Sequence, residues 1–136
     1  MVQLSELVVI ENGLQLRGKV DTYRDPEGDT LYLQARDIAP TGIVHFDNAM
    51  PLAAGFKDTD RLSLRPGDLV TVNRGEGMRT GLVTTDSPML AIPAYSLHRI
   101  TVHSPDRVDE RYLWWYLNRP IVRKRIAALN PGKTIP

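Results

Sequence analysis

The pattern of the sequence changes near residue 109, and this change most limits how the chain can fold. Up to that point, short apolar runs rich in β-branched residues alternate with turns that contain glycine, proline or aspartate. Beyond it, apolar side chains recur at helical spacing over residues 109–118 and 120–129. Many short strands followed by a helical pair predict an α+β fold.

The runs with strand character are bounded by recognisable turns. Residues 25–29 and 65–68 combine proline, glycine and aspartate, and Thr41-Gly42 separates two further runs. Residues 5–10 fit either a short helical turn or a strand, and residues 47–60 look irregular. We expect strands over residues 30–35, 43–46, 69–73, 82–85, 91–94 and 97–102.

The first helix has a clear start and an apolar face. Asp109 can cap it, and the acidic residues at its start suit the positive end of the helix dipole. Leu113, Trp114 and Leu117 fall on one face of this helix. We therefore expect Trp114 to pack in the core and Trp115 to lie at a rim or an interface.

The length of 136 residues is that of one domain, and we expect residues 1–136 to form one. The chain has no cysteine, which excludes disulfide scaffolds, cysteine–zinc sites and thiol catalysis. No apolar run approaches the length of a membrane span, and the N-terminus lacks the layout of a signal peptide. We therefore expect a cytoplasmic protein that does not bind a membrane.

The net charge of +1 conceals a division between the two halves of the chain. Residues 1–60 contain 5 Lys/Arg and 10 Asp/Glu, a net charge of −5, whereas residues 61–136 contain 12 and 6, a net charge of +6. The basic half indicates an anionic partner. The alternative is that folding mixes the two halves into one neutral surface, and the composition leaves both open.

The glycine-rich stretch from Arg74 to Gly81 is the first candidate for a ligand-binding loop. It follows a strand, as a phosphate-binding loop does, but a second β-branched run follows it where such a loop needs a helix. A β-hairpin is the better interpretation. Arg74 and Arg79 flank its tip, and arginine suits bidentate contact with guanine or phosphate. A solvated hairpin whose arginines bind nothing is the alternative.

No motif indicates catalysis, a metal or a cofactor. The serines have no nucleophile-elbow context, and paired carboxylates such as Asp106 and Asp109 are typical of caps. His45, His98 and His103 lack metal-ligand spacing, and we expect them at the surface or half-buried. The expected protein is not an enzyme. A small hydrolase with a site assembled from scattered residues is kept as an alternative.

Several loose motifs follow one another over residues 4–136. In chain order they are Leu4 to Gly13, Gln34-Ala35-Arg36-Asp37-Ile38, Gly42-Ile43, Leu64-Arg65-Pro66-Gly67-Asp68-Leu69, Arg74 to Gly81, and Tyr112-Leu113 to Leu117 with a helix that ends near Gly132. The Leu-x-x-Gly-Asp turn is the sharpest, since glycine permits a tight turn and the aspartate can cap it. In order and spacing, the chain resembles the target-recognition domain of the specificity (S) subunit of type I restriction-modification systems.

This resemblance implies a target-recognition-domain fold, in which a twisted, mostly antiparallel sheet forms a β-rich core with a C-terminal helical pair. It implies that such a domain reads one half of a split DNA sequence. A full S subunit carries two of these domains, and the helices between them hold the DNA methyltransferase (M) subunits. The complex methylates adenine and, with a restriction (R) subunit, cuts unmodified DNA, while the S subunit catalyses nothing. We expect the chain to form one such domain without spacer helices, which leaves homodimerisation and docking to an M subunit open.

The resemblance predicts a sequence-specific module that binds double-stranded DNA. The expected DNA-binding residues are basic and lie beside turns or on the closing helices: Arg17, Lys19, Arg36, Arg74, Arg79, Arg119, Arg123, Lys124 and Lys133. Arg36, Arg74 and Arg79 are the candidates for base edges, and the lysines and the arginines of the closing helices are candidates for phosphates. The alternative is a degenerate S fragment that binds a methyltransferase or another protein through its Trp/Tyr helix.

Overall fold

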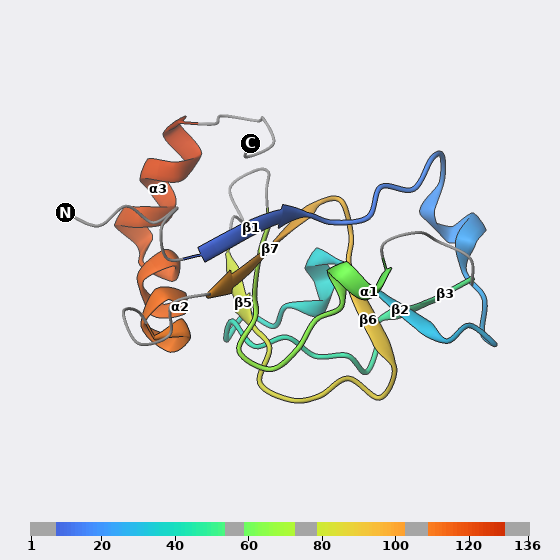
Figure 1. Ribbon diagram of the computed structural model, residues 1–136. Helices are drawn as coiled ribbons and strands as arrows, with labels where there is room; N and C mark the ends of the chain where they lie inside the picture. The colour runs from blue at the N-terminus through green and yellow to red at the C-terminus, as the bar shows by residue number, and fades with distance from the viewer. Residues whose placement is uncertain (1–7, 54–58, 73–78, 103–108, 130–136) are drawn as a thin grey trace.

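The computed structural model describes residues 8–53, 59–72, 79–102 and 109–129. Figure 1 shows the two C-terminal helices at one end of these residues, and strands with short helical segments over the rest. The elements in chain order are β1 (Val8–Asn12), η2 (Val20–Tyr23), β2 (Thr30–Leu33), η3 (Ala35–Asp37), β3 (Met50–Leu52), α1 (Thr59–Leu62), β4 (Leu69–Val72), β5 (Thr80–Leu82), β6 (Leu90–Pro93), β7 (Leu97–Val102), α2 (Glu110–Asn118) and α3 (Pro120–Leu129).

The described strands form two sheets. The larger has the order β1–β7–β4–β5, and each of its neighbouring pairs is antiparallel. The smaller has the order β3–β2–β6, in which β2 pairs antiparallel with β3 and parallel with β6. The predicted α+β class, with a mostly antiparallel core and a C-terminal helical pair, is therefore confirmed, and the core is divided between two sheets.

Strand β4 lies between two apolar layers, which explains why three of its four residues are apolar. All four of its residues are buried. Leu69 packs with Leu113 and Leu117 of α2 on one face of the strand. Val70 and Val72 pack on the opposite face with residues of β2 and β6. A strand covered on both faces has no polar face to alternate with the apolar one. The four-stranded sheet thus lies between the helices and the three-stranded sheet (Figure 1).

The Leu-x-x-Gly-Asp turn has the geometry that its sequence predicts. Gly67 has a φ of 97°, in the left-handed region that glycine reaches without strain. The Asp68 carboxylate accepts a hydrogen bond from the Arg65 N–H at 3.0 Å, and the Asp68 N–H donates to the Arg65 carbonyl at 3.0 Å. Burial raises the pKa of Asp68, although these contacts and the nearby Arg99 oppose the rise. The turn leads directly into β4 and so fixes where that strand begins.

Three expectations about secondary structure are wrong in part. The strand expected over residues 82–85 is β5 (Thr80–Leu82), which shares only Leu82 with that range. Residues 43–46 do not form a regular strand, because Ile43 and Val44 make only isolated bridges, to Leu82 and Ile38. The stretch 47–60, expected to be irregular, contains β3 and the start of α1. Strand β3 includes a proline and lies at the edge of its sheet, where the missing N–H is tolerated. The antiparallel pairing of β4 with β5 confirms the predicted hairpin, whose tip at 73–78 lies outside the described residues.

His98 is a correction to the expectation of surface or half-buried histidines. It is 2% exposed within β7, where it faces Asn12 of β1 and Thr71 of β4, and its Nε2 is buried without a hydrogen-bond partner among the described residues. Burial lowers the pKa of His98 below its ordinary value of 6.5. Exposed His45 fits the expectation, and His103 lies outside the described residues. None of the helices described here is long and apolar enough to cross a membrane.

Candidate nucleic-acid interface

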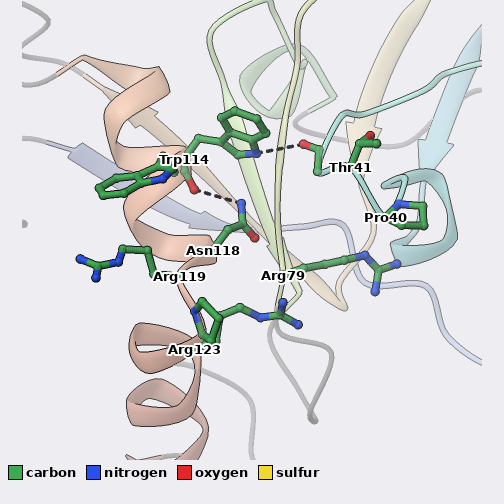
Figure 2. A pocket seen from close by; sticks show the side chains of 10 residues that line it. Pro40, Thr41, Arg79, Trp114, Asn118, Arg119 and Arg123 are labelled. Atoms are coloured by element: carbon green, nitrogen blue, oxygen red, sulfur yellow. Dashed lines mark hydrogen bonds between the residues drawn. The ribbon is translucent and has the colours of Figure 1, made fainter.

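Two side chains hold the end of α2 against strand β5. The Asn118 side chain accepts a hydrogen bond from the Thr80 N–H at 2.9 Å, and it donates to the carbonyls of Thr80 and Trp114 at 2.8 and 2.9 Å. The Trp114 indole N–H donates to the carbonyls of Gly42 and Thr80 at 3.0 and 3.1 Å. These bonds place the junction between α2 and α3 beside the turn at 39–42 (Figure 2).

Trp114 packs on the core cluster beneath α2, as expected, and its position requires glycine at residue 42. Gly42 has a φ of 85°, and a Cβ atom there would lie 2.9 Å from the indole nitrogen of Trp114. A side chain at this position would therefore displace the indole and separate the turn from α2. Trp115, the next residue, is 53% exposed, which fits the expected rim position.

A cavity of about 370 Å³ lies at the α2–α3 junction. Its lining comes from the turn at 40–42, from the start of β5 and from the facing ends of α2 and α3. The charged residues in the lining are Arg79, Arg119 and Arg123, and no described acidic residue joins them. The fold thus brings together three of the predicted DNA-binding residues from two distant parts of the sequence.

Arg79 contacts the backbone of another element. Its Nη2 donates to the carbonyls of Ala35 and Ile38 at 2.8 and 3.3 Å, and its Nε is buried without a hydrogen-bond partner in the described structure. Arg79 therefore fastens the β4–β5 hairpin to η3, the element that carries Arg36. Its expected contact with base edges stays a prediction, and one of its terminal nitrogens already has protein partners.

Arg119 and Arg123 differ in what surrounds their guanidinium groups. The Arg119 guanidinium lies over the Trp115 ring, 5.1 Å from the ring centroid. The Arg123 side chain is half-buried and forms no hydrogen bond or ion pair with any described residue. Figure 2 shows Arg123 extending across the cavity on the side of Arg79, while Arg119 points the other way.

The other predicted DNA-binding residues are dispersed. Lys124 is exposed on α3 but does not line the cavity. Arg36 lines a second cavity, of about 230 Å³, together with Asp37 and Asp47, and its Nη2 donates to the Asn48 carbonyl at 3.5 Å. Burial raises the pKa of Asp37, while the Gln34 N–H and Arg36 oppose the rise.

Four candidates lie away from this interface or outside the described residues. Arg17 and Lys19 are exposed and precede η2, which Figure 1 shows at the end of the molecule opposite to α2 and α3. Arg74 and Lys133 lie outside the described residues. The structure therefore does not bring Arg17 and Lys19 to the cavity at the α2–α3 junction.

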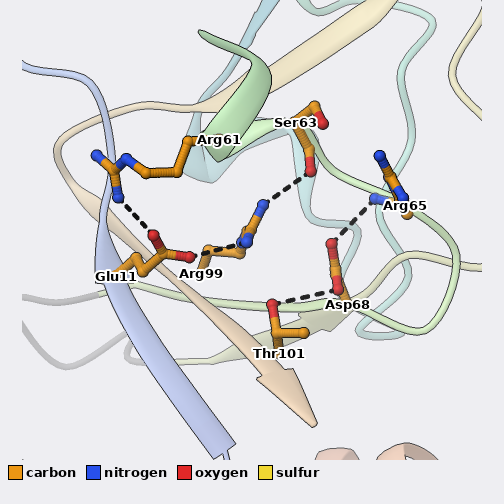
Figure 3. A network of polar contacts seen from close by, with 7 residues as sticks. All are labelled: Glu11, Arg61, Ser63, Arg65, Asp68, Arg99 and Thr101. Atoms are coloured by element: carbon orange, nitrogen blue, oxygen red, sulfur yellow. Dashed lines mark hydrogen bonds and ion pairs between the residues drawn. The ribbon is translucent and has the colours of Figure 1, made fainter. Parts of the chain in front are cut away.

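Two other arginines are paired with a carboxylate, and none of these three residues lines the cavity (Figure 3). Glu11 of β1 accepts from Arg99 of β7 at 2.8 Å and from Arg61 of α1. The second terminal nitrogen of Arg99 donates to the Ser63 carbonyl at 2.8 Å. This network joins β1, β7 and the segment before β4, so these arginines have a structural role.

Asn118 was not among the predicted site residues, although it determines where α2 ends relative to β5. Its partner Thr80 is 38 positions away, so no local spacing connects the two residues.

The exposed aromatic side chains of α2 lie on another face of the helix, where the ring centroid of Tyr112 is 5.8 Å from that of Trp115 and 6.4 Å from that of Tyr116.

Comparison with known proteins identifies the fold. No family model and no curated protein matches the sequence. The HsdS subunit from Thermoanaerobacter tengcongensis is similar to 95% of this chain, with a TM-score of 0.66 and 18% identity, and the match covers 29% of that subunit. The type I restriction-modification system S subunit from M. genitalium is similar to 95% of the chain, with a TM-score of 0.53, 16% identity and 28% of that subunit covered.

A third solved structure concerns complex assembly and conformational transition of the type I restriction-modification system. One of its chains is similar to 99% of this chain, with a TM-score of 0.65 and 16% identity, and the match covers 30% of that chain. At these identities the likeness establishes the fold. The chain has the fold of one portion of a type I S subunit and spans about 30% of the length of these structures. The fold expected from the order of motifs is thus confirmed.

Proposed function

We propose that the chain is a sequence-specific DNA-binding module of a type I restriction-modification system, and that residues 1–136 form one target-recognition domain. The observation that carries this proposal is the cavity that gathers Arg79, Arg119 and Arg123 without a described carboxylate, on a fold shared with S subunits. Arginine is the residue best suited to bind phosphate oxygens and guanine edges. The module would itself catalyse nothing.

The proposed partners are double-stranded DNA, a DNA methyltransferase (M) subunit and a restriction (R) subunit, all within the cytoplasm. The module would bind DNA and direct adenine methylation by the M subunit to the bound sequence. Contacts to phosphates would supply most of the affinity, and side chains at base edges would supply the selectivity. A purely protein-binding role is not favoured, because the neighbours in fold are specificity subunits.

The test is to express the chain together with an M subunit encoded beside it and to map methylated adenines across the genome. We expect methylation at one sequence motif when the chain is present and none at that motif when the chain is absent. Binding selected from a random duplex library should enrich the same motif. Methylation that is independent of the chain, together with no enriched sequence, would overturn the proposal.

A further inference from the structure

The cavity at the α2–α3 junction contains an imbalance of charge. Arg79 and Arg123 are both half-buried there, and neither contacts a carboxylate among the described residues. By contrast, Arg99, which is also half-buried, is paired with Glu11. Burial of a charge without a counter-charge is unfavourable, and proteins pair such groups or bind an ion with them. The missing counter-charge indicates that the cavity binds an anion.

We infer that this cavity is a discrete site for one phosphate group, with Arg123 as its main ligand and Arg119 at its rim. Three arginines line it, of which Arg123 extends across it (Figure 2), and the fork of a guanidinium matches the oxygens of a phosphate. Pro120, the first residue of the ten-residue helix α3, also lines the cavity. The positive end of the α3 dipole lies there, but the negative end of the α2 dipole opposes it, because Asn118 at the C-terminal end of α2 lines the same cavity. The positive charge of the site therefore comes from the arginines.

Two other polar side chains of the cavity already bind the backbone. Asn118 makes three hydrogen bonds to backbone groups, and one Arg79 nitrogen holds two carbonyls. Arg123, in contrast, has its terminal nitrogens free of described partners. Arg79 therefore acts as a positioning residue that adds positive potential, and Arg123 is the group able to bind oxygens directly.

The phosphate can come from a DNA backbone or from a free nucleotide. The volume of about 370 Å³ is at the lower end of the range for ligand sites, and it admits a phosphate with its attached sugar. The assignment to a DNA backbone rests on the proposed function, whereas the phosphate site itself does not. The test must therefore distinguish two questions: whether the cavity binds a phosphate group, and whether that phosphate belongs to DNA.

Tryptophan fluorescence measures binding at this site directly, because the chain has two tryptophans and both line the cavity. We would titrate the full chain with inorganic phosphate, with acetate and with a short duplex of arbitrary sequence, at constant ionic strength within each titration, and repeat the duplex titration at several salt concentrations. Arg123→Gln removes the main ligand. Arg125→Gln is the matched control, since it removes the same charge from an exposed position on α3 that does not line the cavity.

We expect phosphate and duplex, but not acetate, to change the fluorescence of the wild-type chain. Arg123→Gln should abolish the response to phosphate, weaken duplex binding about tenfold and lower the salt slope by about one. Arg125→Gln should retain the response to phosphate. Arg123→Lys keeps the charge without the fork, and it should restore part of the response, with circular dichroism confirming that each variant is folded.

Three results would overturn parts of this inference. An unchanged phosphate response in Arg123→Gln excludes the assigned ligand. An equal response to acetate shows a general anion site and overturns the assignment to phosphate. A response to phosphate without any response to duplex supports the site but overturns its DNA source, and that result would count against the proposed function without affecting the cavity.

Discussion

Replacement of Asn118 by alanine removes the connection between α2 and β5 on which the proposed interface depends. Three hydrogen bonds are lost, and the N–H of Thr80, a residue that is 1% exposed, is left without its partner. The Thr80 carbonyl keeps the Trp114 indole N–H as a donor. A buried donor without a partner costs about 1–3 kcal/mol, and each lost hydrogen bond about 1 kcal/mol net. Because these terms overlap, we expect the free energy of unfolding to fall by about 2–4 kcal/mol.

Urea unfolding followed by circular dichroism measures this loss. With a slope of about 2 kcal/mol/M, the midpoint should fall by roughly 1–2 M at an unchanged slope. Asn12→Ala is the control, because Asn12 is exposed in β1, and it should change the free energy by no more than about 0.5 kcal/mol. If Asn118→Ala were as mild as this control, the hydrogen bonds to Thr80 would not hold α2 in place.

Three further substitutions test other parts of the structure. Gly42→Ala should destabilise the fold by about 1–3 kcal/mol in thermal melts, more than Gly18→Ala, because both glycines have positive φ but only Gly42 has an indole within 2.9 Å of the added Cβ. Glu11→Gln should lower the free energy of unfolding by about 1–3 kcal/mol, because it leaves the half-buried Arg99 without its carboxylate, whereas Asp21→Asn, which breaks the exposed pair with Arg24, should have almost no effect. His98 has a lowered pKa in the folded chain, so its contribution to stability is complete above pH 6.5 and is lost as the pH falls through the folded value. Urea midpoints measured between about pH 7.5 and 5 should therefore decline more steeply for the wild type than for His98→Gln, and equal slopes would contradict the burial of this imidazole.

The elements that the sequence predicts well are those with strong local signals. Strand β4 follows a Gly-Asp turn and consists of four apolar or β-branched residues, so its position depends on its own sequence. Helix α2 begins where expected, because the Asp109 carboxylate accepts from the Arg111 N–H at 2.7 Å and so caps it. Helix α3 begins at Pro120, whose fixed φ suits a first helical turn.

The elements that were missed depend on partners far away in the sequence. Residues 50–52 form a strand because Thr30 to Tyr32 offers them an edge, and their own proline gives the opposite signal. His98 is buried because β7 lies between β1 and β4 in the sheet. The sequence around His98 does not show that its strand is central. Neither outcome follows from the spacing of residues within a single segment.

The candidate site shows the same limit of local reasoning. Arg79 was selected because it flanks a glycine-rich loop, yet its Nη2 binds two carbonyls of the segment 35–38, more than 40 positions away. The residue types in the basic run on α3 were identifiable, but only the fold distinguishes Arg123, which lines the cavity, from Lys124 and Arg125, which do not. Comparing substitutions of Arg123, Lys124 and Arg125 therefore tests an assignment that follows from the structure and not from the sequence alone.

The division of charge between the two halves of the chain now has a physical explanation. Among the described residues, folding mixes the halves where Glu11 from the acidic half pairs with Arg61 and Arg99 from the basic half. It does not mix them at the α2–α3 junction, where no described carboxylate meets Arg119 or Arg123. Three of the 12 Lys/Arg of residues 61–136 thus line one cavity without a described carboxylate. Because unpaired arginines there would release counterions from DNA, substitutions at this junction should lower the salt dependence of binding.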